Sequence, residues 1–161
     1  MPQSFEYIVN EKTTSLIIGS MPGVASLEAG EYYAHPQNLF WRFVFEAFGE
    51  DFNAPDYQHK TTLLLQHSIG LWDAAGTCVR EGSLDSNIKD VVPNDFYSLF
   101  LAYPKIERLL FNGKKAFELF KRFHAPLLNN KTYLVLPSTS PANASIPLEK
   151  RRKLWFAALQ G

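Results

Sequence analysis

Short apolar segments rich in β-branched residues alternate with segments of helical periodicity along the whole chain. The apolar segments predict buried strands, and they span residues 15–20, 68–73, 106–112 and 131–137. The helical patterns span residues 37–48, 56–67, 93–104, 113–124 and 147–160. Because alternating strands and helices are joined by right-handed crossovers, the strands are expected to run parallel. The predicted fold is an α/β protein, a three-layer α/β/α sandwich with a central four-stranded parallel sheet.

The composition fits one globular domain that covers residues 1–161. Of the 161 residues 46% are hydrophobic, and no Gly/Ser linker or internal repeat divides the chain. No apolar run is long enough to span a bilayer and the first residues lack a signal-peptide pattern, so a cytoplasmic protein is expected. The formal net charge is zero, which argues against a protein that coats nucleic acid. The single cysteine, Cys78, excludes an intramolecular disulfide and any cluster held by several thiolates.

The predicted topology gathers several polar loops at one edge of the sheet. Ligands of parallel sheets bind at the carboxyl ends of the strands. The loops expected at this edge are residues 19–23, 72–76, 111–115 and 137–143, and the stretch YYAHPQN (32–38) leaves the first of them. Together they are rich in amides, hydroxyls and aromatic rings, and poor in strong acids and bases.

Asn38 is the residue of this region that most needs an explanation. An apolar stripe at helical spacing follows it, formed by Trp41, Val44, Phe45 and Phe48. Pro36 fits the first turn of this helix and Gly49 fits its end. Three residues before Trp41, the Asn38 amide is predicted on the same inward face, where a polar group needs a partner or a function.

The other candidates each have two interpretations. The glycine-bracketed loop GSMPG (19–23) suits close approach to a ligand, but it lacks the lysine of a P-loop and a tight turn explains it equally well. Tyr32 and Tyr33 are core aromatics or platforms that stack on a base. The loop 137–143 donates hydroxyls and amides to phosphates or leads into a helix capped near Ser145.

The titratable residues of the region do not form a recognisable catalytic set. Asp73 ends a buried strand, and Asp85 is a loop acid that could cap a helix. His35 and His124 have no partners at metal-ligand spacing, so no metal site is expected. No nucleophile elbow or Ser-His-Asp arrangement is present.

Three of these segments, taken in order and spacing, resemble motifs of the uracil-DNA glycosylase superfamily, whose fold is an α/β/α sandwich. LIIGSMPG (16–23) looks like its first motif, the strand and the water-activating loop. YYAHPQNLFW (32–41) closely resembles the Phe/Tyr-Ala-His-Pro-x-Asn-x-Phe-Trp stretch of the mismatch-specific branch. LPSTSPAN (136–143) looks like the last motif, the loop that presses into the duplex. The resemblance spans nearly the whole chain.

Two departures from the motifs point to one branch of the superfamily. The catalytic Asp or Asn of the first motif is replaced by Met21, which cannot polarise water, and the histidine of the last motif by Leu136. The branch that lacks both, and carries GSMPG with DSNI (85–88), is the hypoxanthine-DNA glycosylase family. The resemblance implies that Asn38 is the catalytic, water-orienting residue. The single cysteine also separates the chain from the iron–sulfur branches, and no cofactor is expected.

The resemblance implies further roles at the site. Tyr33 or Tyr32 would stack on the flipped base, backbone amides around Ser20 and Met21 would help to hold it, and Asp73 would read its edge. Asp85 and Asn87 are the alternatives for reading the edge. The residues expected to contact DNA are Pro22, Gly23, His35, Ser138, Thr139, Ser140 and Asn143. The implied protein is a monomeric, monofunctional glycosylase of base excision repair that acts on DNA containing a deaminated base.

Three alternatives remain open from the sequence. One is a uracil or mismatched-thymine glycosylase of the same fold, against which Met21 argues. Another is a DNA-binding relative without catalytic activity, against which Asn38 argues. The last is a small-molecule hydrolase, for which the chain offers no nucleophile or metal set.

Overall fold

The computed structural model describes residues 2–143 and 145–161 and contains a four-stranded parallel sheet. Its strands are β1 (Ser15–Gly19), β2 (Ile69–Asp73), β5 (Arg108–Asn112) and β6 (Thr132–Leu136), in the spatial order β2-β1-β5-β6. All three pairings are parallel, and Gly19 lies beside Asp73 at the carboxyl ends of β1 and β2. The predicted α/β/α fold and its parallel sheet are therefore confirmed.

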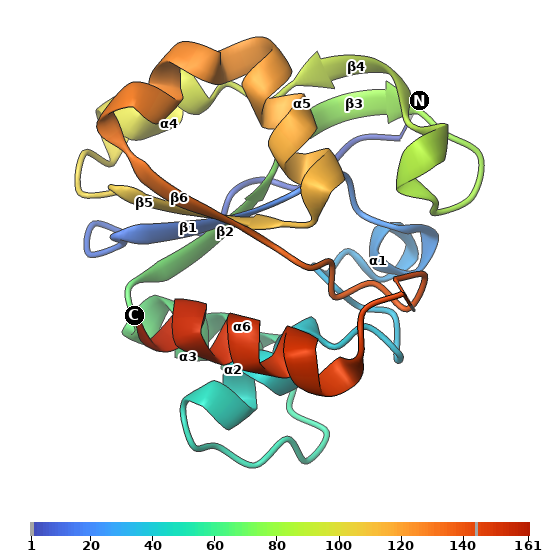
Figure 1. The fold of residues 1–161 in the computed structure, drawn as a ribbon, viewed down its shortest axis with the longest axis vertical. Helices are drawn as coiled ribbons and strands as arrows, with labels where there is room; N and C mark the ends of the chain where they lie inside the picture. The colour runs from blue at the N-terminus through green and yellow to red at the C-terminus, as the bar shows by residue number, and fades with distance from the viewer. Residues whose placement is uncertain (1, 144) are drawn as a thin grey trace.

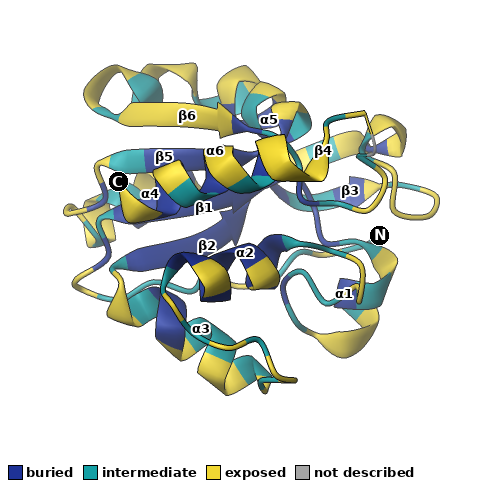
Figure 2. Cartoon of the chain, turned by 60° about the horizontal axis from the view of Figure 1, so that its bottom comes forward, coloured by how far each residue is buried: buried dark blue, intermediate teal, exposed yellow. Residues whose placement is uncertain are grey.

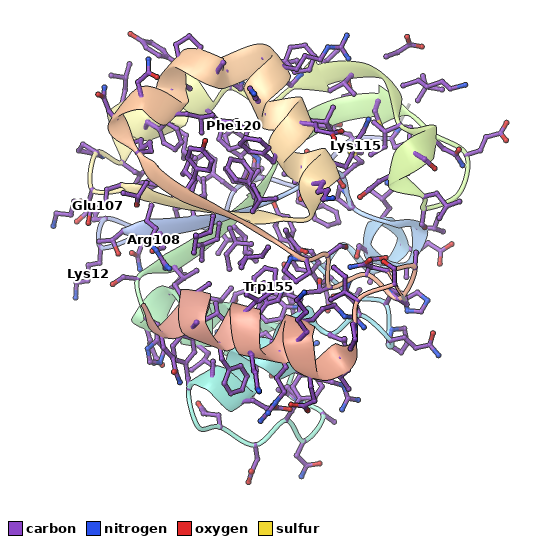
Figure 3. All side chains as sticks on the ribbon, in the orientation of Figure 1. Lys12, Glu107, Arg108, Lys115, Phe120 and Trp155 are labelled. Carbon is purple, nitrogen blue, oxygen red and sulfur yellow. The ribbon has the colours of Figure 1, made fainter. Side chains whose placement is uncertain are left out.

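Helices cover both faces of the sheet (Figure 1). On one face lie α2 (Phe40–Ala47), α3 (Tyr57–Gln66) and α6 (Leu148–Gln160), and on the other α4 (Phe96–Ala102) and α5 (Lys114–His124). Since side chains alternate along a strand, Ile17 of β1 packs with the first group and Leu16 and Ile18 with the second. Figure 3 shows Trp155 and Phe120 entering these two cores from α6 and α5.

The two edges of the sheet differ in their cover. The N-terminal segment lies along β2, where Ile8 and Leu71 exchange two backbone hydrogen bonds of 2.9 Å. Strand β6 is the opposite edge, and all of its residues except Leu136 are exposed (Figure 2). Within the described residues, no helix is long and apolar enough to cross a membrane.

The start of α2 and the capping of α6 differ from the sequence prediction. Helix α2 begins at Phe40, so Pro36 and Asn38 precede it and the Asn38 amide does not lie on a helical face. The backbone N–H of Phe40 is satisfied by Asn38 Oδ1 at 2.9 Å, which explains why the helix begins there. Helix α6 starts after Pro147 without a side-chain cap, and the Ser145 hydroxyl bonds to Asn143 instead.

Several elements had no counterpart in the prediction. A short helix α1 (Val24–Ala29) follows β1, and an antiparallel hairpin of β3 (Ala75–Val79) and β4 (Lys89–Pro93) follows β2. The loop of this hairpin contains the 3₁₀ helix η1 (Asp85–Asn87), and another, η2 (Ala125–Asn130), follows α5. Because Pro93 ends β4, the predicted helix 93–104 shortens to Phe96–Ala102, with the Asp95 carboxylate as its cap.

Candidate active site

A cavity of about 740 Å³ opens at the carboxyl ends of the parallel strands. Its volume lies in the usual range for pockets that bind small molecules. The lining is formed by residues 19–26, 32, 33, 35, 38, 73, 83–86, 112–114, 135–143, 145, 146, 150 and 154. These are the loops at the right of Figure 1, on the side of the molecule toward which β1, β5 and β6 run. The ligand edge predicted from the sequence is therefore where this cavity forms.

Asn38 lines the cavity from the turn that precedes α2. Its backbone N–H donates to the His35 carbonyl at 2.9 Å, which closes the turn, and its Oδ1 accepts from Phe40 N–H. The amide orientation is therefore fixed by the start of the helix. Within the described part of the chain, Asn38 Nδ2 makes no hydrogen bond. The side chain is half-buried, so part of its hydrogen-bonding capacity remains for a molecule in the cavity.

The two tyrosines before Asn38 occupy different positions. Tyr32 is only 3% exposed, and its hydroxyl donates to the Glu6 carbonyl at 2.9 Å. Its backbone is held on both sides, because its N–H donates to Tyr57 Oη at 3.1 Å and its carbonyl accepts from Trp41 Nε1 at 2.8 Å. Although Tyr32 reaches the cavity wall, it is principally a core residue.

Tyr33 places its ring at the cavity with the help of an unusual backbone conformation. Its φ of 56° lies in the left-handed region, which bulky residues rarely adopt. The ring packs on Phe40 with 4.2 Å between centroids. Burial and the nearby Asp73 carboxylate raise the pKa of the Tyr33 phenol, so the hydroxyl is a neutral donor. Of the two tyrosines, Tyr33 is the better candidate for stacking.

Asp73 places a carboxyl group at the base of the cavity, where β2 ends. The residue is 3% exposed, and its Oδ2 is buried without a hydrogen-bond partner among the described residues. Burial, reinforced by the negative charge of Asp85 and opposed by Arg80, raises its pKa from 3.8 to about 7. An added Cβ at Gly19 would collide with Asp73 Oδ1 and lie 2.9 Å from the Tyr33 hydroxyl, so this contact depends on glycine.

The loop after β1 is joined to the hairpin loop by three polar contacts. Ser20 Oγ donates to Asp85 Oδ1 at 2.7 Å, Val24 N–H donates to Ser83 Oγ at 2.8 Å, and the Arg80 guanidinium donates to the Pro22 carbonyl. Burial raises the pKa of Asp85, whereas the Ser20 hydrogen bond and the charges of Arg80 and Lys115 lower it. The contacts fix one wall of the cavity.

The opposite wall is the loop after β6, and Asn112 anchors it. Asn112 Oδ1 accepts from Thr139 N–H and its Nδ2 donates to Thr139 Oγ1, both at 3.0 Å. The Thr139 carbonyl in turn accepts from Leu39 N–H at 3.1 Å. This chain of bonds connects the end of β5, the last loop and the residue that follows Asn38.

The comparisons with known proteins agree with this architecture. The family model of the uracil DNA glycosylase superfamily matches residues 6–159, which is nearly the whole chain. The chain belongs to the uracil DNA glycosylase superfamily.

Its similarity to individual members of the superfamily extends over almost their full length. It is 38% identical to a hypoxanthine DNA glycosylase of Methanosarcina barkeri and 39% identical to one of Methanosarcina acetivorans. In each case the alignment covers 160 residues and 98% of both chains. A solution NMR structure of a candidate uracil DNA glycosylase from M. acetivorans matches with a TM-score of 0.84 and 38% identity, over 98% of this chain and 96% of that one.

Most of the residues predicted for the glycosylase site line the cavity, but three of them are poorly placed to contact a ligand with their side chains. Asn87 lies outside the lining, because it is exposed on η1 and its amide donates to the Glu81 carbonyl. Thr139 is fully buried, and the bonds to Asn112 occupy its hydroxyl and its N–H. Met21 lines the cavity, but it is only 6% exposed and packs into an apolar core.

The remaining candidates of the glycosylase lie on the cavity rim. Among them, Pro22 and Gly23 line the side of the first loop, and His35 is exposed with Nδ1 accepting from Gln37 N–H. Ser138, Ser140 and Asn143 form the last loop, where Ser138 Oγ accepts from Ser140 N–H and Asn143 Nδ2 donates to the Ser138 carbonyl. These bonds shape the loop and leave its outer surface open.

Sequence reasoning missed two residues that organise the site. Asn112 could have been recognised, since a polar side chain that ends a buried strand before glycine needs a partner. Arg80 gave no such signal, because it follows a hairpin strand that was not predicted. No group of three or more His, Cys, Asp or Glu side chains suited to a metal ion occurs within residues 2–143 and 145–161.

Proposed function

We propose that this superfamily member is a monofunctional DNA glycosylase that hydrolyses the N-glycosidic bond of hypoxanthine in DNA. The observation that carries the proposal is the combination of Asn38 at the cavity with Met21 at the position of the usual catalytic acid. A sequence identity of 38–39% over 98% of two named hypoxanthine DNA glycosylases supports the choice of base. The chain is proposed to act as one domain, residues 1–161, and as a monomer in the cytoplasm.

The target nucleotide must first leave the base stack. Unstacking costs a few kcal/mol, and least for a damaged, poorly paired base. Tyr33 offers a ring on which the flipped base stacks, and such stacking contributes about 1–3 kcal/mol per base. The backbone amides around Ser20 and Met21 lie at the same wall. Stacking therefore offsets much of the cost of flipping.

Asn38 is proposed to orient the attacking water. An amide is too weak a base to take a proton at neutral pH, so its contribution must be positioning and stabilisation of charge. Its Oδ1 is already held by Phe40 N–H, which keeps the amide rigid. The base departs as an anion while the water reaches C1′ of an oxocarbenium-like sugar, and the proton released from the water is left to solvent.

Asp73 is the better of the two carboxylates to read the base edge. Hypoxanthine presents an N1–H donor, whereas adenine presents an N1 acceptor. Asp73 Oδ2 has no partner of its own, but Asp85 Oδ1 already accepts from Ser20. A carboxylate at Asp73 therefore matches the N1–H of hypoxanthine and repels the lone pair of adenine N1.

The DNA backbone is proposed to be held mainly by neutral groups. The hydroxyls of Ser138 and Ser140, His35 and the amides near Pro22 and Gly23 lie on the rim, and such groups bind phosphates without positive charge. Thr139 contributes by positioning this loop and not by its own hydroxyl, which is bonded to Asn112.

The test is an excision assay on end-labelled duplexes that contain one hypoxanthine, one uracil or one G:T mismatch, each treated with hot alkali. Strand breaks at hypoxanthine in excess over the other two are expected. Breaks mainly at uracil or at the mismatch would favour a general uracil or mismatch glycosylase. Tight DNA binding without any break would favour a non-catalytic DNA-binding protein.

A further inference from the structure

Leu84 lies on the loop of the β3–β4 hairpin, and no step of the glycosylase mechanism above uses it. The residue is 52% exposed, and it lines the cavity. In Figure 1 this loop and the loop after β6 both project at the right of the molecule, beyond the carboxyl ends of the parallel strands. An apolar side chain is therefore exposed at the place where the DNA is proposed to dock.

The backbone on both sides of Leu84 is fixed by polar contacts. Ser83 Oγ accepts from Val24 N–H at 2.8 Å, and Asp85 Oδ1 accepts from Ser20 Oγ at 2.7 Å. Both neighbours of Leu84 are thus bonded to the loop after β1, whereas the Leu84 side chain remains exposed. Because the loop is already held, its side chains lose little conformational freedom when they bind.

The loop after β6 offers no comparable side chain, although the family resemblance implies that it presses into the duplex. Residues 137–143 (PSTSPAN) contain no Leu, Ile, Val, Met or aromatic residue. The exposed apolar groups of this loop are small, namely the ring of Pro141, which is joined to its own backbone, and the methyl group of Ala142. This loop can approach the DNA backbone closely, but it has little apolar surface to offer the base stack.

Extrusion of a nucleotide leaves a gap in the base stack that favours an apolar side chain. Proteins that deform DNA insert side chains such as Leu, Phe, Ile or Met as wedges between neighbouring bases. Among the described residues, three other exposed apolar side chains line the cavity: Val24 in α1, Val135 in β6 and Leu154 in α6. These three lie on the broad surfaces of helices and a strand, whereas Leu84 projects from a loop that is narrow enough to enter the stack.

We propose that Leu84 inserts into the base stack of the duplex and fills the gap that the extruded nucleotide leaves. This inference rests on the proposed function, in which the target base is flipped into the cavity. It assigns the wedge to the hairpin loop and leaves the loop after β6 to hold the DNA backbone. Leu84 is a positioning residue in this scheme, because it stabilises the extruded state and touches no reacting atom.

Three substitutions at Leu84 separate apolar surface from side-chain length. Leu84→Ala truncates the side chain, Leu84→Gln keeps its length without the apolar end, and Leu84→Met keeps an apolar side chain. Leu101→Ala is the matched control, since Leu101 is a 67% exposed leucine on α4 that lies outside the cavity lining. Because both leucines are exposed, all variants should fold, which urea unfolding checks.

The first readout is binding to two duplexes that contain 2′-fluoro-deoxyinosine, whose glycosidic bond resists hydrolysis. One duplex has an ordinary base opposite inosine, and the other has a pyrene ring there, which fills the stack and expels inosine without help from the protein. Leu84→Ala and Leu84→Gln should bind the ordinary duplex about tenfold more weakly than the native protein, as expected for the lost burial of roughly half a leucine side chain. Both should bind the pyrene duplex nearly as the native protein does.

The second readout is single-turnover excision of hypoxanthine from the same two duplexes made with deoxyinosine. The loss in Leu84→Ala should again appear on the ordinary duplex and disappear on the pyrene duplex. Leu84→Met and Leu101→Ala should match the native protein on both duplexes.

Two results for Leu84→Ala would overturn the inference: native binding to the ordinary duplex, or an equal loss on both duplexes. A loss that pyrene reverses in Pro141→Ala, and none in Leu84→Ala, would overturn it by assigning the wedge to the last loop. If Leu84→Ala does not fold, the contrast between Leu84→Gln and Leu84→Met decides in the same way. A native protein that shows the expected binding but excises no hypoxanthine would reject the proposed reaction and leave the wedge in place.

Discussion

The carboxyl of Asp73 couples the stability of the protein to the chemistry of its pocket. Its folded pKa of about 7 lies well above its ordinary value of 3.8, and burial is the main cause. In the unfolded chain the same group ionises freely at neutral pH. Ionising Asp73 is therefore less favourable in the folded protein than in the unfolded chain. Such a cost is typical of a residue kept for binding, because a purely structural core avoids it.

Asp73→Asn should raise the stability of the protein at pH 8. Because the pKa of Asp73 is raised in the folded state, its contribution to the free energy of unfolding is fully present below about pH 4. This contribution is lost as the pH rises toward 7. The difference between the folded and the ordinary pKa of Asp73 corresponds to at most roughly 4 kcal/mol in the free energy of unfolding. Urea unfolding at pH 5, 6, 7 and 8 measures the effect, and the variant should gain stability relative to the native protein as pH rises. A constant difference across this range would mean that Asp73 titrates normally.

Tyr33 is the residue at which backbone strain and the proposed base stacking coincide. Tyr33→Ala should weaken binding of a duplex with a flipped, non-hydrolysable inosine by about 10- to 100-fold, because a stacked base contributes about 1–3 kcal/mol. Tyr33→Phe keeps the ring and the contact with Phe40, and should bind nearly as the native protein does. Equal binding by the alanine and phenylalanine variants would show that another group supports the base.

At the scale of elements, the site depends on contacts between strand ends and loops. Asn112 at the end of β5 makes two 3.0 Å hydrogen bonds to Thr139, and Thr139 bonds to the backbone of Leu39 beside Asn38. These bonds connect the last loop to the turn that contains Asn38. Because these bonds form a continuous chain, a change at Asn112 should alter the position of Asn38 without direct contact.

Asn112→Ala should lower both stability and activity. It removes two buried hydrogen bonds and leaves Thr139 N–H without its partner, which costs about 2–4 kcal/mol. Asp56→Ala is a matched control, since Asp56 caps α3 by accepting from His59 N–H at 2.8 Å and lies outside the cavity lining. The control should lose about 1 kcal/mol of stability and no activity. Denaturant unfolding and single-turnover excision on both variants distinguish a site effect from a general loss of stability.

The elements that could be predicted from sequence are those whose side chains alternate or repeat with a clear period. Strand β1 is wholly buried and its residues Leu16, Ile17 and Ile18 are apolar, so its position was evident to within one residue. The β3–β4 hairpin was missed because β3 contains Gly76 and β4 ends in Pro93, both of which weaken a strand pattern. Helix α1 was missed because it has only six residues.

The site was predictable to the extent that strand ends define it. Parallel topology alone placed the loops after β1, β2, β5 and β6 together, and with them Asn38, Tyr33 and Asp73. The hydrogen-bond partners and the protonation of these side chains were not predictable, because they depend on contacts between residues far apart in the sequence. The Ser20–Asp85 bond, the Asn112–Thr139 bonds and the bond from the half-buried Arg80 to Pro22 all join residues more than 25 positions apart.

In the whole molecule, the two layers of helices cover the faces of the sheet and leave the carboxyl ends of its strands open to a ligand. Figure 3 shows Lys115 near that edge, and Glu107 and Arg108 at the opposite end of the sheet. Arg108 there bonds to the Ala158 carbonyl at 2.6 Å and fixes the last turn of α6. One end of the sheet therefore contributes stability and the other carries the proposed chemistry.

Asn38 is proposed to carry catalysis in a glycosylase whose first motif lacks an acid. The most direct test is the single-turnover rate of hypoxanthine excision by the native protein and by Asn38→Ala, with binding to non-hydrolysable inosine DNA measured in parallel. We expect Asn38→Ala to lose a factor on the order of 10²–10³ in rate with little change in binding. A variant that keeps the native rate, or loses binding in proportion to rate, would contradict it.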